Sequence, residues 1–244
     1  MDFHAIKIQH PDDSEFHLLK NLLLEADGGV FIDVGANVGA MTLLAHSTGL
    51  TSSILAFEPS HRYCLAYHNN MSVNQIENAT LIQAAVGDQC GEIRFRVDPK
   101  LPLNGKIDRG NVHYSTQVQT VKIVTLDTIC AALNIDEIAL LKIDVEGAEP
   151  MVIRGAKKLL SRHKVNSILL EFIIEFMEDM EEDPYNFVTT LTDLGYDFYG
   201  INPNGSLGEV LEPTSLVDAR RVTPDHPMRP FCEINVIAKL RGLG

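Results

Sequence analysis

The chain has 244 residues and a mass of 27.0 kDa, which fits one α/β domain and leaves ample length to bury a core. Its hydrophobic content of 45% and charged content of 22% are those of an ordinary globular protein. The formal net charge of −13 argues against nucleic acid or an anionic membrane as partner, because both need a basic face. A small or neutral partner is expected instead.

The cysteines and the N-terminal residues indicate the cellular compartment in which the protein is expected. The four cysteines lie far apart without CxxC spacing, so we expect reduced core thiols and neither a zinc site nor a dense disulfide framework. Residues 1–16 are acidic and contain no apolar signal region, and no stretch approaches the roughly 20 apolar residues of a membrane span. We therefore expect a cytoplasmic protein.

Apolar positions at helical spacing predict a first helix over residues 14–26. Short apolar strands then alternate with helical patterns, which predicts a mostly parallel sheet of seven strands with helices on both faces. The expected strands are 30–34, 52–59, 79–88, 138–145, 167–172, 196–201 and 234–240. The expected helices after the first are 40–47, 61–75, 125–133, 148–163 and about 184–194. The helix at 125–133 is opened by Thr125 or Asp127.

Two segments depart from this alternation. EIRFRV and QVQTVKIVTL alternate apolar and polar residues with period two, and they flank a loop at 98–117 that is rich in Gly, Pro and Asn. They predict a β excursion near 91–124. The whole chain is expected to form one domain of Rossmann-like α/β class, with residues 1–27 as a helical cap and 28–244 as the catalytic core. Its ligand should sit beyond the carboxyl ends of the strands.

The turn after the first strand, DVGANVG, indicates the kind of ligand. A dinucleotide fingerprint reads GxGxxG, but here Gly35-Ala36-Asn37-Val38-Gly39 places Asn37 at the second glycine position. Asp33 would repel a pyrophosphate, whereas it would attract an ammonium group. S-adenosylmethionine has an amino-acid tail and no phosphate, and the following helix N-terminus favours the carboxylate of that tail.

Further residues support a nucleoside ligand. Glu58 ends the next strand, 19 residues after Gly39, where its carboxylate can accept hydrogen bonds from both ribose hydroxyls. Glu58 does not distinguish S-adenosylmethionine from a nicotinamide dinucleotide, but Asp33 and Asn37 favour the former. Ala85 and Val86, before the Gly87-Asp88 turn, are expected beside the adenine from topology.

These motifs resemble those of a known family. FIDVGANVG, AFEP, AVGD, VTLD and especially LLKIDVEGAEPMVIRGA are similar to the FkbM family of S-adenosylmethionine-dependent methyltransferases, over about residues 28–172. The resemblance implies a class I methyltransferase fold and O-methylation, since such members mostly act on hydroxyls of sugars and secondary metabolites. A methyltransferase of protein or RNA, or a catalytically silent cofactor-binding protein, would be alternatives.

The carboxylates after the fourth helix-flanked strand are the candidate catalytic groups. Removing a proton from an alkyl hydroxyl needs a nearby base. In KIDVEGAEP, Asp144 is the candidate for the side of the cofactor or of the methyl acceptor, and Glu146 is the candidate general base. Simple ion pairs with Lys142, Arg154 or Lys157 are the alternative for both. Glu149 falls in the first turn of the next helix, where we expect it to cap free N–H groups.

Two more candidates lie elsewhere, and one motif is discounted. Glu171 ends the fifth strand, where a metal-dependent enzyme is expected to show Asp-Asn. One carboxylate remains there and the amide is missing, so we expect a metal-free site, with a metal-assisted one as the alternative. His113, in the loop rich in Gly and Asn, could reach the methyl acceptor. Asp183-Pro184-Tyr185 is similar to a DPPY signature but follows the wrong strand, which indicates the start of a helix. The sequence leaves the identity of the methyl acceptor and the oligomeric state open.

Overall fold

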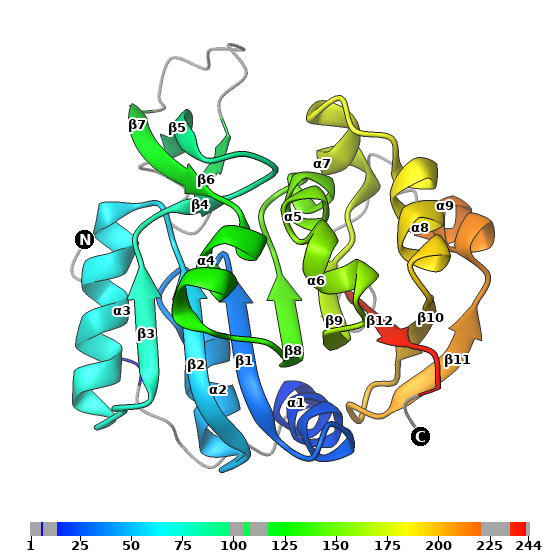
Figure 1. Ribbon diagram of the computed structural model, residues 1–244, viewed down its shortest axis with the longest axis horizontal. Coiled ribbons are helices and arrows are strands. Elements are labelled where there is room, and N and C mark those ends of the chain that lie inside the picture. The colour runs from blue at the N-terminus through cyan, green and yellow to red at the C-terminus, as the bar shows by residue number, and fades with distance from the viewer. Residues whose placement is uncertain (1–5, 7–13, 98–104, 108–116, 221–234, 243–244) are drawn as a thin grey trace.

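The computed structural model describes residues 6, 14–97, 105–107, 117–220 and 235–242. Within these residues, eight strands form the main sheet in the order β11-β10-β12-β9-β8-β1-β2-β3 (Figure 1). Their bounds are β1 Gly29–Val34, β2 Thr51–Phe57, β3 Ala79–Ile82, β8 Ile138–Ile143, β9 Val165–Glu171, β10 Tyr196–Ile201, β11 Leu207–Leu211 and β12 Asn235–Leu240.

The predicted α/β class is confirmed, but the predicted number of seven strands is wrong for this sheet. The five strands from β3 to β9 pair in parallel, as their near-continuous apolar sequences indicate. β12 pairs antiparallel with both β9 and β10, and β11 adds a further antiparallel strand at the edge. The segment of β11, LGEVL, contains a glycine, a glutamate and the exposed Val210, so its sequence gives a weak strand signal.

The predicted strand 79–88 is in fact two strands in two sheets. β3 ends at Ile82, and the chain then leaves the main sheet and forms β4 (Ala85–Val86) in a second sheet. That sheet has the order β4-β7-β5-β6 among the described residues, with β5 Gly91–Val97, β6 Gly105–Ile107 and β7 Gln117–Val124. The predicted β excursion is therefore confirmed. Figure 1 shows this small sheet beyond the carboxyl edge of the main sheet.

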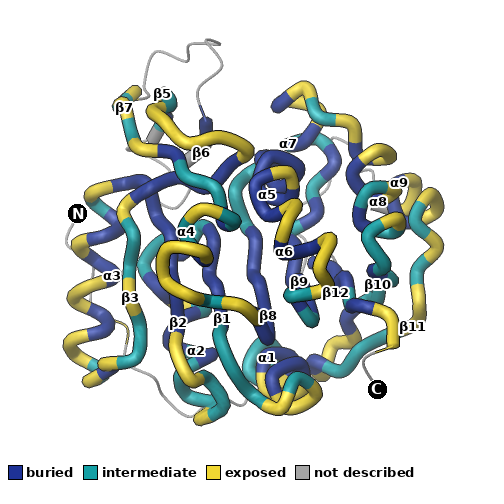
Figure 2. Tube along the Cα trace, in the orientation of Figure 1, coloured by how far each residue is buried: buried dark blue, intermediate teal, exposed yellow. Residues whose placement is uncertain are grey.

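Helices cover both faces of the main sheet. On one face lie α1 (Ser14–Glu25), α2 (Ala40–Ser47) and α3 (His61–Val73). On the other lie α4 Leu126–Leu133, α5 Glu149–Gly155, α6 Lys157–Ser161, α7 Ile174–Asp179, α8 Pro184–Asp193 and α9 Pro213–Arg220. β8 runs between the two layers and is buried along its whole length (Figure 2). No helix in the described ranges is long and apolar enough to cross a membrane.

The leucine pattern of α1 explains how this helix binds the sheet. Leu18, Leu19, Leu22 and Leu23 recur at helical spacing, and all four are buried against apolar side chains of β1, β2 and β8. Burying a leucine side chain is worth about 1.5–3 kcal/mol, so this face outweighs the weak propensity of an isolated helix of this length. The predicted helix 14–26 is confirmed to within one residue.

The predicted helix 148–163 is interrupted at Ala156, and the interruption has a visible cause. The Asp127 carboxylate accepts hydrogen bonds from the backbone N–H of Lys158 at 2.9 Å and of Leu159 at 3.0 Å. Asp127 thus caps the start of α6, whereas Thr125 caps α4 by accepting from the Thr128 N–H. Asp183 likewise caps α8, which confirms that the DPY sequence marks a helix start.

The AVGD turn is clamped against α5. A Cβ atom on Gly155 would lie 1.9 Å from the Gly87 carbonyl oxygen, so the helix can approach the turn only because this residue has no side chain. Arg154 reinforces the contact, since its Nε lies 3.1 Å from Asp88 and its two terminal nitrogens bind both oxygens of Glu182. This contact fixes β4, and with it one wall of the site described below.

We predict that Gly155→Ala destabilises the fold by about 2 kcal/mol, because overpacking forces the α5 backbone away from the turn. Urea unfolding measures this change. Gly200→Ala is the matched control, since its Cβ would meet nothing closer than Leu211 Cδ1 at 4.0 Å. A Gly155→Ala variant as stable as the wild type would contradict the close contact.

Candidate active site

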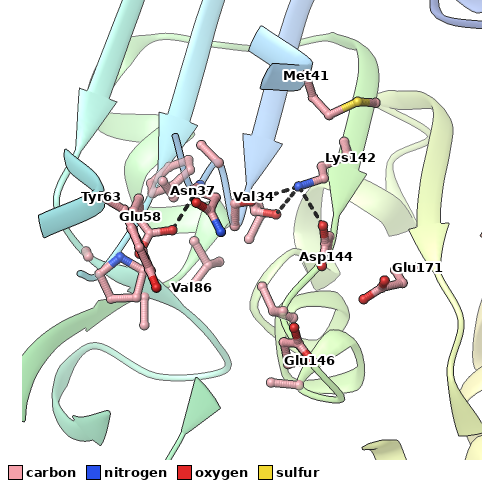
Figure 3. Close-up of a pocket in the computed structure, with 18 of the residues that line it drawn as sticks. Val34, Asn37, Met41, Glu58, Tyr63, Val86, Lys142, Asp144, Glu146 and Glu171 are labelled. Carbon is pink, nitrogen blue, oxygen red and sulfur yellow. Dashed lines mark hydrogen bonds and ion pairs between the residues drawn. The ribbon is translucent and has the colours of Figure 1, made fainter. Parts of the chain in front are cut away.

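A cavity of about 330 Å³ opens at the carboxyl edge of β1, β2, β8 and β9. Its walls come from the turn after β1, the end of β2, the β4 segment, the small sheet and residues 142–148 (Figure 3). Figure 3 shows Asn37, Glu58 and Tyr63 on one side, and Met41, Lys142, Asp144 and Glu171 on the other. The location agrees with the rule that ligands of open α/β sheets bind beyond the strand ends.

The glycine turn forms the cavity floor in a conformation that depends on Gly35. This residue has a φ of +77°, and a Cβ atom on it would lie 1.9 Å from the Asp144 carbonyl oxygen. The Gly35 and Ala36 N–H groups both donate to the Phe57 carbonyl oxygen, at 3.0 and 2.9 Å. Gly35, Ala36 and Asn37 line the cavity, and their contact with a cofactor stays a prediction.

Gly39 has a different place from the other predicted residues of this turn. It precedes α2 with a φ of +89° and does not belong to the cavity wall. A Cβ atom there would lie 2.7 Å from the Tyr67 ring and 2.8 Å from the Met71 methyl group. Gly39 therefore allows α2 and α3 to pack closely, which is a structural requirement of the turn and not a contact with the cavity.

Glu58 is a buried carboxylate at the cavity wall. Only 5% of the residue is exposed, and burial raises the pKa of its carboxyl group from 4.5 to about 7. Oε2 accepts from the Asn37 N–H at 3.0 Å and Oε1 from the Ser60 N–H at 2.8 Å. Each oxygen retains a lone pair for a ligand hydroxyl. Ala85 and Val86 also line the cavity, so the structure brings these predicted residues together with Glu58.

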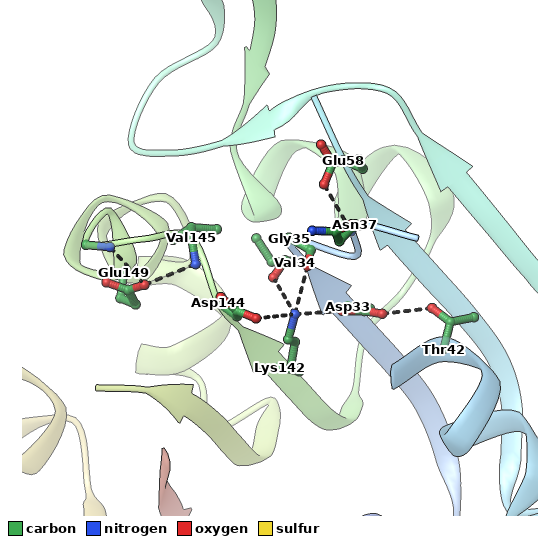
Figure 4. A network of polar contacts seen from close by, with 11 residues as sticks. Asp33, Val34, Gly35, Asn37, Thr42, Glu58, Lys142, Asp144, Val145 and Glu149 are labelled. Atoms are coloured by element: carbon green, nitrogen blue, oxygen red, sulfur yellow. Dashed lines mark hydrogen bonds and ion pairs between the residues drawn. The ribbon is translucent and has the colours of Figure 1, made fainter. Parts of the chain in front are cut away.

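Asp33 lies beneath the cavity. It is 0% exposed, its Oδ2 accepts a hydrogen bond from the Thr42 hydroxyl at 2.8 Å, and its Oδ1 lies 3.3 Å from Lys142 Nζ (Figure 4). Asp33 is not part of the cavity wall, whereas its partner Lys142 is. Its predicted contact with a ligand ammonium group stays a prediction.

Lys142 is a site residue that the sequence reasoning treated only as a partner for ion pairs. Its side chain is 7% exposed and lines the cavity. Nζ lies 2.8 Å from the Gly35 carbonyl oxygen and 3.3 Å from both Asp33 Oδ1 and Asp144 Oδ2. The two carboxylates hold the pKa of this ammonium above its ordinary value even though burial opposes the charge. The sequence did offer one signal for this site residue, because Lys142 lies two residues before Asp144 at the end of the strand.

The predicted catalytic carboxylates meet at one end of the cavity. Asp144, Glu146 and Glu171 all line it, although they come from the end of β8, the following turn and the end of β9. Burial raises the pKa of the Glu171 carboxyl group above its ordinary value, and the negative charges of Asp144, Glu146 and Glu149 raise it further. Asp144 forms the ion pair with Lys142 that was the alternative to a catalytic role, and its catalytic role stays a prediction. His113 lies outside the described residues.

The turn that carries Glu146 is held in an unusual backbone conformation. Glu146 has a φ of +56°, a left-handed value that is uncommon for a residue with a side chain, and Gly147 follows with +99°. A Cβ atom on Gly147 would lie 2.1 Å from the Phe176 carbonyl oxygen, so the turn is pressed against α7. Such conformations often mark functional sites. Here the conformation places Glu146 at the cavity wall.

Glu149 has the structural role that its place in the sequence predicts. Its Oε1 accepts from the backbone N–H of Val145 at 3.1 Å and of Gly147 at 3.3 Å, which closes the turn around Glu146 (Figure 4). Burial raises the pKa of Glu149 from 4.5 to about 7, against the lowering effect of these hydrogen bonds. Glu149 is 2% exposed and does not line the cavity.

Several apolar or aromatic lining residues had no recognisable signal in the sequence. Phe95 and Ile107 belong to the small sheet, while Tyr63 and Met41 project from α3 and α2. Each lies outside the glycine turn, and only the packing of the small sheet and helices brings them to the cavity. Within the described parts of the chain, no group of three or more His, Cys, Asp or Glu residues is arranged to hold a metal ion.

Comparison with known proteins assigns the family. The model of the methyltransferase FkbM domain matches residues 33–198, and the chain therefore belongs to the FkbM methyltransferase family. Its cofactor is accordingly S-adenosylmethionine. The cavity fits this cofactor, because Glu58, beside the glycine turn, keeps lone pairs for ribose hydroxyls.

Particular relatives resemble only part of the chain. It is 27% identical to Methyltransferase 1 of Beauveria bassiana, over 53% of this chain and 59% of that protein. It is also 27% identical to the 2-O-methyltransferase NoeI of Sinorhizobium fredii, over 57% of this chain and 62% of that protein. The chain thus spans about six tenths of the length of these relatives. The structure of SMU.1697c from Streptococcus mutans in complex with SAH is 12% identical, covers 96% of this chain and 100% of that one, and has a TM-score of 0.50, which shows a shared fold.

We predict that Glu149→Gln changes how stability depends on pH. The folded protein binds the Glu149 proton more tightly than the unfolded chain does, so this group stabilises the fold fully below about pH 4.5. That contribution is lost as the pH rises through about 7. Relative to the Glu149→Gln variant, the wild type should lose about 3 kcal/mol between about pH 5 and 8.

Urea unfolding at a series of pH values measures this difference. The exposed Glu209→Gln variant is the control and should follow the wild type throughout. The account of Glu149 would be wrong if the Glu149→Gln variant and the wild type kept a constant difference in stability across this range.

Proposed function

We propose that this protein transfers the methyl group of S-adenosylmethionine to a hydroxyl of a small metabolite or sugar. The observation that carries the proposal is the division of the cavity, with Glu58 and the glycine turn at one end and Asp144, Glu146 and Glu171 at the other. The name of the related 2-O-methyltransferase NoeI supports transfer to oxygen. The net charge of −13 supports a small or neutral substrate.

The residues at the first end bind and orient the cofactor in this proposal. When bound, S-adenosylmethionine supplies a methyl group activated by a sulfonium. Glu58 accepts hydrogen bonds from the ribose hydroxyls, while the backbone N–H of Asn37 keeps the Glu58 carboxylate in place. Ala85, Val86 and the apolar side chains of the small sheet exclude water from the adenine. Holding both reactants in one dry cavity removes most of the entropic cost of the encounter.

The residues at the second end bind and deprotonate the methyl acceptor. The carboxyl oxygens of Asp144 and Glu171 at the cavity wall can accept a hydrogen bond from a substrate hydroxyl. Glu146 is placed at the cavity wall by its left-handed turn and acts as the general base, taking the hydroxyl proton on its carboxylate. Lys142 holds Asp144 beside the glycine turn, so that the two ends keep a fixed separation.

We predict that the protein forms S-adenosylhomocysteine when it is given S-adenosylmethionine and a panel of monosaccharides, disaccharides and small hydroxylated metabolites. Glu146→Gln should lower kcat by about 100-fold or more, because a general base contributes about that much. Binding of S-adenosylhomocysteine, measured by calorimetry, should stay within a few-fold of the wild type. Glu209→Gln is the control and should retain full activity.

Two results would contradict the proposal. Turnover of amine acceptors with none of hydroxyl acceptors would assign a different chemistry. Full activity of the Glu146→Gln variant would remove the proposed base while leaving the methyltransferase assignment intact.

We further predict that EDTA leaves the activity unchanged. Lys142 Nζ lies 3.3 Å from the Asp144 carboxylate, and this ion pair makes Asp144 a weaker ligand for a hard cation. The measurement is S-adenosylhomocysteine formation before and after treatment with EDTA. Activity that is lost in EDTA and restored by Mg²⁺ would overturn the proposal of a metal-free mechanism.

A further inference from the structure

The ammonium group of Lys142 is surrounded by oxygen atoms of the protein. A lysine carries three N–H donors, and Nζ lies close to the oxygens of Gly35, Asp33 and Asp144, with the Val34 carbonyl oxygen at 3.5 Å as well. Lys142 lines the cavity, and its ammonium group contacts the glycine turn and both carboxylates at once. It can therefore act on a ligand through the groups that it holds.

The three partners of Lys142 differ in how they face the cavity. Asp33 is sealed beneath it, with its carboxylate between Lys142 and Thr42. The Gly35 carbonyl belongs to the turn that lines the floor. The Asp144 side chain is 41% exposed and is the open end of the network. Lys142 thus connects the buried Asp33 both to the Gly35 turn and to the exposed Asp144.

The charges around Lys142 are strongly unbalanced. Glu58, directly after β2, feels the charges of both Lys142 and Asp33. Around Asp144 lie Glu149 of α5 and Glu171 of β9, and Glu146 of the following turn adds to the negative charge at Glu171. Lys142 is the cation that pairs with Asp33 and Asp144. If it were removed, Asp33 would be a buried charge without its counter-ion, and Asp144 would be repelled by its neighbours.

We propose that Lys142 is a positioning residue for S-adenosylmethionine, and that Asp33 acts on the cofactor only by holding Lys142 in place. Lys142 fixes the Gly35 turn and Asp144 relative to one another, across the junction of β1 and β8. This proposal rests on the methyltransferase assignment but not on the identity of the methyl acceptor. In this proposal Asp33 does not contact the ammonium group of the cofactor. It affects cofactor binding indirectly, by holding Lys142.

The test is a double-mutant cycle with Asp33→Asn, Lys142→Met and the two combined. Binding of S-adenosylhomocysteine is measured by calorimetry and stability by urea unfolding. We expect Lys142→Met to weaken binding at least tenfold and Asp33→Asn to weaken it less. The combined variant should bind no more weakly than Lys142→Met alone. If the fold-losses of affinity in the two single variants multiply in the combined variant, Asp33 contacts the cofactor independently of Lys142. That result would overturn the proposal.

Stability separates positioning from a purely structural role. The combined variant contains no uncompensated Asp33 charge, so it should regain most of the stability that Lys142→Met loses. The proposal predicts that affinity does not return with it, because nothing then holds Asp144 and the turn. Recovery of affinity together with stability would contradict it. If Lys142→Met does not fold, Lys142→Gln takes its place in the cycle, since its amide can still donate to the Gly35 carbonyl.

Two controls make each failure specific. Lys164→Met removes a lysine that pairs with the exposed Glu137 at the other end of the sheet, and it should leave binding unchanged. The wild type is titrated first. If it does not bind S-adenosylhomocysteine, the assigned cofactor is wrong, whereas normal wild-type binding with unaffected Lys142 variants overturns only the role of Lys142.

Discussion

The buried contact between Lys142, Asp33 and the Gly35 carbonyl is the constraint on which the site depends. It joins the ends of β1 and β8, the neighbouring strands whose turns form the cavity floor. A buried lysine is tolerated only when its charge is compensated, and here two carboxylates and a carbonyl provide that compensation. The same contact brings Asp144 to the cavity, so the stability of the strand ends and the shape of the site share one cause.

The rest of the site follows from how this junction is enclosed. Gly35, Gly147 and Gly155 allow backbone contacts that a Cβ would prevent. They bring the turn after β1 against the end of β8, the Glu146 turn against α7, and α5 against the Gly87 turn. Enclosure excludes water, and the loss of water raises the pKa values of Glu58, Glu149 and Glu171. The cavity region thus holds carboxyl groups that titrate near or above neutral pH, and such groups suit the exchange of protons with a substrate.

Much of this arrangement could be predicted from the sequence because it is local. Apolar strands and glycine turns placed Gly35, Asn37, Glu58 and Asp144 at strand ends, and the structure brings them to one cavity. The misses were not local. The depth of Asp33, the capping of α6 by Asp127 and the approach of Phe95 to the cavity depend on side chains that are distant in sequence. The extra strand β11 was missed because its residues are half-buried or exposed and lack a clear period.

A crystal structure with bound S-adenosylhomocysteine tests the central claim most directly. The account predicts that the ribose hydroxyls lie within hydrogen-bonding distance of Glu58. It also predicts that the sulfur faces Glu146, with Lys142 still between Asp33 and the ligand. A ligand bound away from Glu58, or a ligand ammonium group in direct contact with Asp33, would contradict the account.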